Sequence, residues 1–196
     1  MPTLIKYIGD YSNIDVNENL IHYCLDSKYE KYYGGSAVLL DSTDSIIKQF
    51  KNVQNIYNKS ENRPVEHFII SFNDKSSKGL TIIDYEVYLM AKAISYYIGS
   101  RFQNVFAVHR GSEKHNNFIY KLIYGPEIDP DNLHVHFTVN RVSYLDGSMF
   151  YGNNINYNEI LNYARNNMHI ILDAYNLKDL KWFGPFTEET YFHSFK

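Results

Sequence analysis

The chain has 196 residues, of which 44% are hydrophobic and 21% are charged, so it can form a folded domain with a buried core. Its 19 basic and 22 acidic side chains give a net charge of −3, which argues against a protein that coats nucleic acid through clustered positive charge alone. Its one cysteine, Cys24, excludes an internal disulfide framework and fits a reducing compartment. Residues 1–11 lack a basic region followed by a long apolar one, so we expect no signal peptide, and no apolar run approaches the roughly 20 residues that span a bilayer. We therefore expect a single cytoplasmic domain over residues 1–196, without a membrane partner.

Apolar residues at helical spacing predict four helices, and alternating apolar residues predict three strands. The helices are expected over about 16–26, from about Ser42–Asp44 onward, over 81–100 and over 158–175, and the strands over 65–73, 103–109 and 133–142. A further strand or hairpin arm is expected over 117–124, whereas Gly34-Gly35 and residues 73–79 are typical of loops. This order of elements predicts an α+β fold, an α/β sandwich in which helices cover the apolar sheet face and the other face stays partly polar.

The predicted strand 133–142 has two faces of different chemistry, because successive side chains of a strand point to opposite sides. One face carries the apolar residues, and the other carries His134, His136, Thr138 and Asn140. His134 and His136 therefore point the same way and suit two ligands of one metal ion, with Thr138 and Asn140 placed for supporting hydrogen bonds. Many H-x-H pairs on half-exposed strands bind nothing, so that alternative stays open.

A third histidine, His109, ends the predicted strand 103–109. If the two strands are neighbours, His109 completes a site of three imidazoles with open positions, which suits metals such as Mn, Zn, Co and Ni. The alternative for His109 is a histidine at a strand end that is hydrogen-bonded to the backbone.

The segments around these histidines resemble the relaxase/mobilisation nuclease family, whose members are HUH endonucleases named for two histidines that flank a hydrophobic residue. The resemblance extends over roughly residues 16–175 and includes the strand Glu66–Phe72, the long helix after it and the strand Val105–His109. Its most specific part is His134-Val135-His136, which is followed four residues later by Asn140. The resemblance implies a central, mainly antiparallel sheet with helices packed on it.

The resemblance also implies an enzyme, a metal-dependent DNA relaxase that nicks and rejoins one strand at the transfer origin of a plasmid or mobile element. Relaxases of this family carry a nucleophilic tyrosine on an early helix, and the segment Asn19–Lys28 is similar to that motif, which gives the role to Tyr23. The product is a 5′-phosphotyrosyl protein–DNA intermediate. The implied partners are single-stranded DNA and accessory DNA-binding and coupling proteins.

The same resemblance implies that His109, His134 and His136 bind a divalent metal ion, Mn or Mg. The family often has an acidic residue two positions after the first metal histidine, whereas this chain has Gly111 there. A longer segment also separates the first histidine from the HUH pair, so His115 remains a substitute for His109.

Several assignments stay open between alternatives. The candidates for a general base or for a ring-orienting partner are Glu66, Asp26 and His67. A rolling-circle replication initiator or transposase would instead use a later tyrosine, and the segment Tyr175–Lys178 fits its Tyr-x-x-Lys motif. A non-catalytic module that binds single-stranded DNA is the other alternative. The candidate phosphate contacts are Lys75, Lys78, Arg101, Arg110, Lys114, Lys121 and Arg141, and the candidate base-stacking residues are Tyr32, Tyr33, Tyr151 and Tyr157.

Overall fold

The computed structural model of the chain describes residues 3–6, 14–25, 30–60, 64–71, 84–110, 133–152, 154–167 and 181–183. Its helices are α1 (Ile14–Cys24), α2 (Thr43–Ile56), α3 (Asp84–Gly99) and α5 (Asn154–Asn167). Its strands are β1 (Thr3–Lys6), β2 (Glu30–Ser36), β3 (Val65–Ser71), β4 (Asn104–Arg110), β5 (Leu133–Asn140) and β6 (Lys181–Phe183). The strand expected over 117–124 and the loop expected over 73–79 lie outside the described residues.

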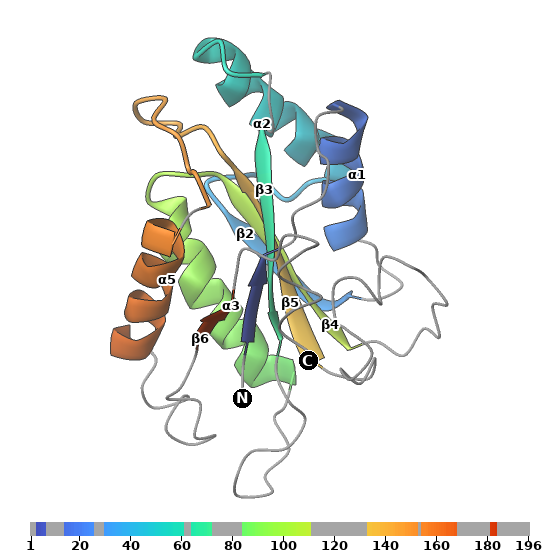
Figure 1. Cartoon of the computed structure of the whole chain (residues 1–196). Helices are drawn as coiled ribbons and strands as arrows, with labels where there is room; N and C mark the ends of the chain where they lie inside the picture. Colours follow the sequence, from blue (N-terminus) through green and yellow to red (C-terminus); the bar gives the residue numbers. More distant parts are fainter. Residues whose placement is uncertain are drawn as a thin grey trace, which may run out of the picture.

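The six strands form one sheet in the order β2-β4-β5-β3-β1-β6, and each neighbouring pair is antiparallel except β1 and β6. Helices α1 and α2 lie on one side of the sheet, and α3 and α5 lie on the other (Figure 1). This arrangement confirms the predicted α+β sandwich with a mainly antiparallel sheet. None of the described helices has the length and apolar character needed to cross a membrane.

The four predicted helices are confirmed with small shifts of their ends. Helix α2 begins after Ser42, whose hydroxyl accepts a hydrogen bond from the backbone N–H of Ser45 and so caps the helix. Helices α1 and α3 end one or two residues before the predicted positions. Helix α5 begins at Asn154, earlier than predicted, and the predicted part after residue 167 lies outside the described residues.

The apolar face of the three central strands packs against α3 and α5. Phe68, Phe137 and Phe106 stand side by side on β3, β5 and β4, and we call them the phenylalanine row. The ring centroids are 4.8 Å apart for Phe68 and Phe137 and 5.7 Å apart for Phe106 and Phe137. Such cross-strand aromatic contacts favour one pairing register over its neighbours.

The polar face of the same strands is also buried, because α1 and α2 cover it. Ile21 and Cys24 of α1 and Ile46, Ile47 and Phe50 of α2 pack against the sheet here. Each residue of β5 is buried, including the polar ones. This face is partly polar, as expected. Because it is also buried, its polar groups need hydrogen-bond partners inside the protein.

Asn140 ties α2 to the sheet and does not reach the histidines of β5. Its side-chain amide donates to the carbonyl of Phe50 at 3.1 Å and to Oε1 of Gln103 at 2.9 Å. Its Oδ1 accepts from Nε2 of Gln54 at 3.1 Å. The supporting role expected for Asn140 beside the histidines is therefore wrong, since the residue clamps the far end of β5 to α2.

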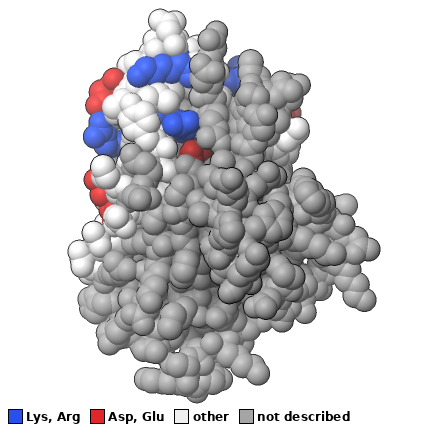
Figure 2. Space-filling model, in the orientation of Figure 1, with Lys and Arg blue, Asp and Glu red and all other residues white. Residues whose placement is uncertain are grey.

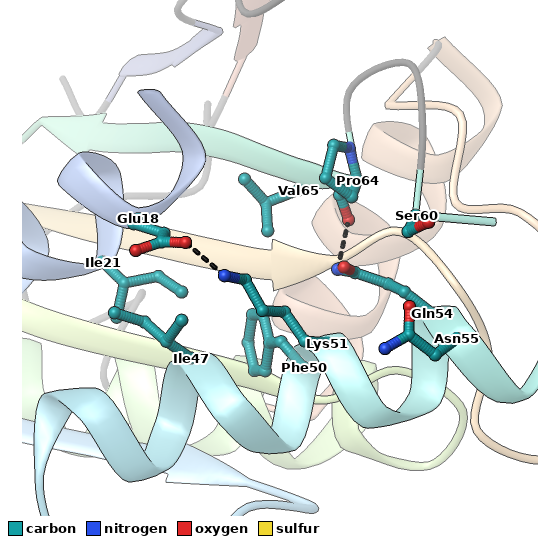
Figure 3. Close-up of a pocket in the computed structure, with 10 residues that line it drawn as sticks. All are labelled: Glu18, Ile21, Ile47, Phe50, Lys51, Gln54, Asn55, Ser60, Pro64 and Val65. Atoms are coloured by element: carbon teal, nitrogen blue, oxygen red, sulfur yellow. Dashed lines mark hydrogen bonds and ion pairs between the residues drawn. The ribbon is translucent and has the colours of Figure 1, made fainter. Parts of the chain in front are cut away.

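A cavity of about 210 Å³ lies beside this clamp, between α1, α2 and the start of β3 (Figure 3). An ion pair between Lys51 of α2 and Glu18 of α1 crosses it, and Gln54 donates a hydrogen bond to the carbonyl of Pro64 at its edge. The cavity borders Val65, which pairs with Asn140, so it lies at the opposite end of β3 from the histidine pair of β5.

The segment Gly34-Gly35 belongs to strand β2 and is not the loop that its composition indicated. A Cβ atom on Gly34 would lie 2.7 Å from the ring of Phe106, and one on Gly35 would lie 2.7 Å from the carbonyl oxygen of Asn104. The glycines therefore allow β2 to approach β4 closely, a use of glycine inside a strand that looks like a turn in the sequence. Strands β1 and β6 were also not predicted.

We predict that Asn140→Leu lowers the free energy of unfolding by about 2–4 kcal/mol, because the buried partners of the amide lose their hydrogen bonds. Asn52→Leu, on the exposed side of α2, is the matched control and should change stability by less than about 0.5 kcal/mol. Urea unfolding measures both. Equal stabilities of the two variants would contradict the clamp.

Candidate active site

The imidazoles of His109, His134 and His136 lie together on the face of the sheet that α1 covers. Strand pairing places His109 of β4 directly opposite His134 of β5. The ring centroids are 4.6 Å apart for His109 and His136, 4.9 Å for His134 and His136, and 5.6 Å for His109 and His134. One ring nitrogen of each residue lies within 4.8 Å of the others, and all three residues are buried. Such a cluster of nitrogen ligands can bind a metal ion.

Tyr23 lies in the last turn of α1, beside this cluster. Its ring meets that of His136 edge-on, with centroids 5.2 Å apart and planes at 88°, and it lies 6.3 Å from that of His109. The residue is 42% exposed, so the phenol is accessible from outside while its ring contacts the buried histidines.

The next residue, Cys24, fastens this end of α1 to both histidine-bearing strands. Its carbonyl lies 3.0 Å from Nε2 of His109, and its thiol donates a longer hydrogen bond of 3.7 Å to the carbonyl of His136. Because a carbonyl can only accept, Nε2 of His109 carries the hydrogen in this bond. The alternative for His109, a hydrogen bond to the backbone, therefore holds for its Nε2 atom. The other ring nitrogen, Nδ1, remains as the candidate ligand atom. The anchoring role of Cys24 was not predicted, and its place after Tyr23 on the apolar side of α1 was the available signal.

His67 of β3 extends the cluster by one more ring. Its Nε2 lies 3.0 Å from Nδ1 of His136, and both residues are buried. Burial, together with the nearby His109 and His134, lowers the pKa of His67 to about 3 and holds the pKa of His136 well below its usual value. Both rings are therefore neutral at pH 7, which is the form that can bind a metal.

Nε2 of His136 is buried and has no hydrogen-bond partner within the described part of the chain. A buried polar nitrogen without a partner is costly, and a cation bound there would remove that cost. This orphaned atom indicates that the cluster fits a metal ion. Thr138 does not support the cluster as we had expected, since its buried Oγ1 also lacks a partner among the described residues.

Glu66, one candidate base, lies on the opposite face of the sheet from Tyr23. Its Oε1 accepts a 2.9 Å hydrogen bond from the hydroxyl of Tyr157 on α5, and its Oε2 lies 4.0 Å from Nε of Arg141. Glu66 therefore stabilises the packing of α5 and is ruled out as the base. Tyr157 is fully buried there, so the expectation that it stacks on DNA bases is wrong. Asp26 lies outside the described residues.

The candidate DNA contacts are only partly described. Arg101 pairs with Asp146 at 2.7 Å, and Nε of Arg141 donates to the carbonyl of Phe150 at 2.8 Å, so both side chains have protein partners. In the view of Figure 2, basic and acidic side chains are interspersed over the coloured part of the surface, and that part shows no continuous basic patch. The other candidate phosphate contacts lie outside the described positions: Lys75, Lys78, Lys114, Lys121 and the side chain of Arg110. His115, the substitute for His109 as a ligand, also lies outside them.

Two of the candidate stacking tyrosines, Tyr33 and Tyr151, are exposed. Tyr33 pairs with Ala107, which pairs with His136, so Tyr33 lies on the histidine face of the sheet. Tyr32 points to the other face, where its ring packs against that of Tyr88 on α3 at 5.3 Å. Tyr33 is thus the one of these four that combines exposure with the histidine face.

Comparison with known proteins gives one family match. The family model described as "Relaxase: MobA/VirD2-like, nuclease domain" matches residues 23–170, which is more than half of the chain. The matched segment begins at Tyr23 and includes His109, His134 and His136. Among curated proteins, none matches this sequence.

We predict that the metal-free protein loses stability as the pH falls from about 6.5 towards 3. His67 and His136 stay neutral in the folded state but take up protons in the unfolded chain below their ordinary pKa of 6.5. The free energy of unfolding should therefore fall by up to about 1.4 kcal/mol per pH unit for each ring.

Urea unfolding of the chelator-treated protein at several pH values measures this slope. His67→Gln should flatten it, whereas Asn52→Gln, on the exposed side of α2, should leave it unchanged because it removes no titratable group. A slope that is identical in the wild type and in His67→Gln would contradict the prediction.

Proposed function

The chain belongs to the relaxases with a MobA/VirD2-like nuclease domain, and from this premise we propose that it nicks and rejoins one DNA strand at the transfer origin of a plasmid or mobile element. The family match confirms the resemblance that the HUH strand indicated. A relaxase domain of this kind is a nuclease that acts on single-stranded DNA. In the proposal, Tyr23 is the nucleophile, and His109, His134 and His136 hold a divalent metal ion.

One observation carries the proposal: the accessible phenol of Tyr23 lies edge-on against the imidazole cluster. Helix α1 and strands β4 and β5 are far apart in the sequence, and their meeting brings a nucleophile and a candidate metal site to one place. Many tyrosines pack at the edge of a core, but few do so over three convergent histidines. Such an arrangement would hold the nucleophile beside a phosphate bound at the histidines.

The proposed reaction exchanges one phosphate ester for another. The phenol of Tyr23 gives its proton to a base as its oxygen attacks the phosphorus, the bond from phosphorus to the 3′ oxygen breaks, and the 3′ oxygen leaves as a hydroxyl after taking up a proton. The product is a 5′-phosphotyrosyl link, and the reverse attack by a 3′-hydroxyl rejoins the strand. Because a phenol has a pKa of about 10, the attack needs a base or a strongly polarised phosphate. With Glu66 on the other face, Asp26 and His67 remain as the candidates for a base or for a ring-orienting partner.

The three histidines would hold the metal ion through ring nitrogens, and substrate oxygens could complete its ligands. A bound divalent cation would act as a Lewis acid on a non-bridging phosphate oxygen and would help to orient it. Cys24 holds the ring of His109 through its carbonyl, so the same turn of α1 positions the nucleophile and one ligand. Of the two metals expected from the resemblance, we propose Mn, because Mg prefers an oxygen shell.

The placement of Tyr23 favours the relaxase over its alternatives. An initiator or transposase would use Tyr175, which lies outside the described residues. A non-catalytic module would bind single-stranded DNA without forming a covalent species. We also propose that residues 1–196 act as one domain in the cytoplasm, with accessory DNA-binding and coupling proteins, and the pairing of β1 with β6 in one sheet supports the single domain.

We predict that Tyr23→Phe abolishes the covalent adduct with single-stranded DNA and leaves the fold intact, because the ring still packs against His136. The assay is incubation with a pool of single-stranded oligonucleotides and Mn²⁺, followed by a denaturing gel. Tyr96→Phe, at an exposed tyrosine of α3 on the other side of the sheet, is the matched control and should retain the adduct.

Tyr175→Phe separates the alternatives in the same assay. We expect it to retain the adduct. If Tyr23→Phe still forms the adduct and Tyr175→Phe does not, the protein is an initiator or transposase. If the wild type forms no adduct with any divalent metal, the non-catalytic module is supported.

We predict that Mn²⁺ binds at least about tenfold more tightly than Mg²⁺, and that Co²⁺ and Zn²⁺ bind more tightly than Mn²⁺, because imidazole ligands follow the usual order for these metals. Titration calorimetry measures each affinity. His134→Ala should weaken Mn²⁺ binding, whereas His22→Ala, at the exposed histidine, should not. Mg²⁺ binding as tight as that of Mn²⁺ would contradict the nitrogen site.

A further inference from the structure

We propose that His67 is a positioning residue that accepts a hydrogen bond from Nδ1–H of His136 and thereby keeps the Nε2 lone pair of His136 available to a metal ion. The inference rests on the proposed function, because it concerns how the metal ion is held. It gives His67 a role distinct from that of a base, although both were open from the sequence.

The two rings meet in the geometry of a well-formed hydrogen bond. Their nitrogens are 3.0 Å apart, their planes differ by only 13°, and their centroids are 5.1 Å apart. The two ring centroids are much farther apart than the two nitrogens, so the rings meet at their edges and their faces do not overlap. The rings of His67 and His136 are therefore nearly parallel and offset, and their two nitrogens meet at the ring edges within hydrogen-bond distance.

Hydrogen positions follow from counting donors. A neutral imidazole has one N–H and one lone pair, so one of the two rings must donate and the other must accept. If His67 donated, the hydrogen of His136 would sit on Nε2, the buried nitrogen that otherwise faces the cluster without a partner, and would block a cation there. If His136 donates from Nδ1, its Nε2 carries the lone pair. Only the second arrangement fits a metal ion in the histidine cluster.

Strand pairing explains why His67 reaches this place. Thr138 lies directly opposite His67, and His136 lies opposite Ile69, so His67 and His136 are diagonal neighbours on one face of β3 and β5. Metal-bound histidines commonly donate their second N–H to a protein acceptor, and loss of that acceptor costs about 10- to 100-fold in metal affinity. In this chain the acceptor is another imidazole.

The test compares variants that keep or remove the acceptor. His67→Phe keeps a ring of similar size but has no acceptor, whereas His67→Gln places an amide oxygen near the position of Nε2. Thr138→Val is the matched control, because it changes the facing buried residue, whose hydroxyl has no hydrogen-bond partner among the described residues. Titration calorimetry with Mn²⁺, without DNA, should show about 10- to 100-fold weaker binding in His67→Phe, little change in Thr138→Val and an intermediate value in His67→Gln.

Nuclear magnetic resonance of the ¹⁵N-histidine-labelled wild type, loaded with Zn²⁺, tests the tautomer directly and does not depend on the folding of any variant. We expect a hydrogen on Nδ1 of His136 and a lone pair on Nε2 of His67. A hydrogen on Nε2 of His67, or metal bound through Nδ1 of His136, would overturn the inference.

The outcomes separate this inference from the proposed function. If the wild type forms the DNA adduct and His67→Phe binds Mn²⁺ as tightly as the wild type, the inference is wrong and the proposed function stands. If the wild type binds no divalent metal, the metal site and the inference fall together.

Discussion

The antiparallel pairing of β4 with β5 is the constraint on which the candidate site depends. It sets His109 opposite His134 and Ala107 opposite His136, so that imidazoles from two strands share one face. Because side chains alternate along a strand, a shift of the register by one residue would send His109 into the apolar layer against α3. The phenylalanine row on the other face opposes such a shift, since its rings also pair across β3, β4 and β5. The apolar core and the site are therefore two results of one register.

The parts of the fold that the sequence predicted correctly are those with a strong local pattern. Alternation in Leu133–Asn140 was enough to separate the apolar residues from His134 and His136, and helical spacing located the four helices. The burial of the polar face was not predictable in this way. It depends on partners that come from other elements, such as the carbonyl of Phe50 and the amide of Gln54, which a pattern within β5 does not contain.

The misjudged features involve contacts between distant segments. Gly34 lies in a strand, and the position needs a glycine because the ring of Phe106 occupies the space that a side chain would fill. Local turn preferences do not reveal this contact. Tyr23 is one of 19 tyrosines, and only the family resemblance singled it out, since nothing near it in the sequence shows that α1 ends over the histidines. Glu66 and His67 are adjacent in sequence, yet they serve opposite faces of the sheet, and packing against α5 decides the role of the first.

The reactivity of the Cys24 thiol can report when the last turn of α1 moves away from the sheet. It is the single cysteine of the sequence, it is fully buried, and it follows Tyr23 in the turn that rests on the histidine-bearing strands. An alkylating reagent needs an exposed thiolate, so it can react only while that turn is lifted from the sheet. The labelling rate of the unmodified protein therefore reports how often the last turn of α1 moves and carries Tyr23 away from the histidines. Any bound ligand that holds α1 against the sheet will slow the alkylation of Cys24.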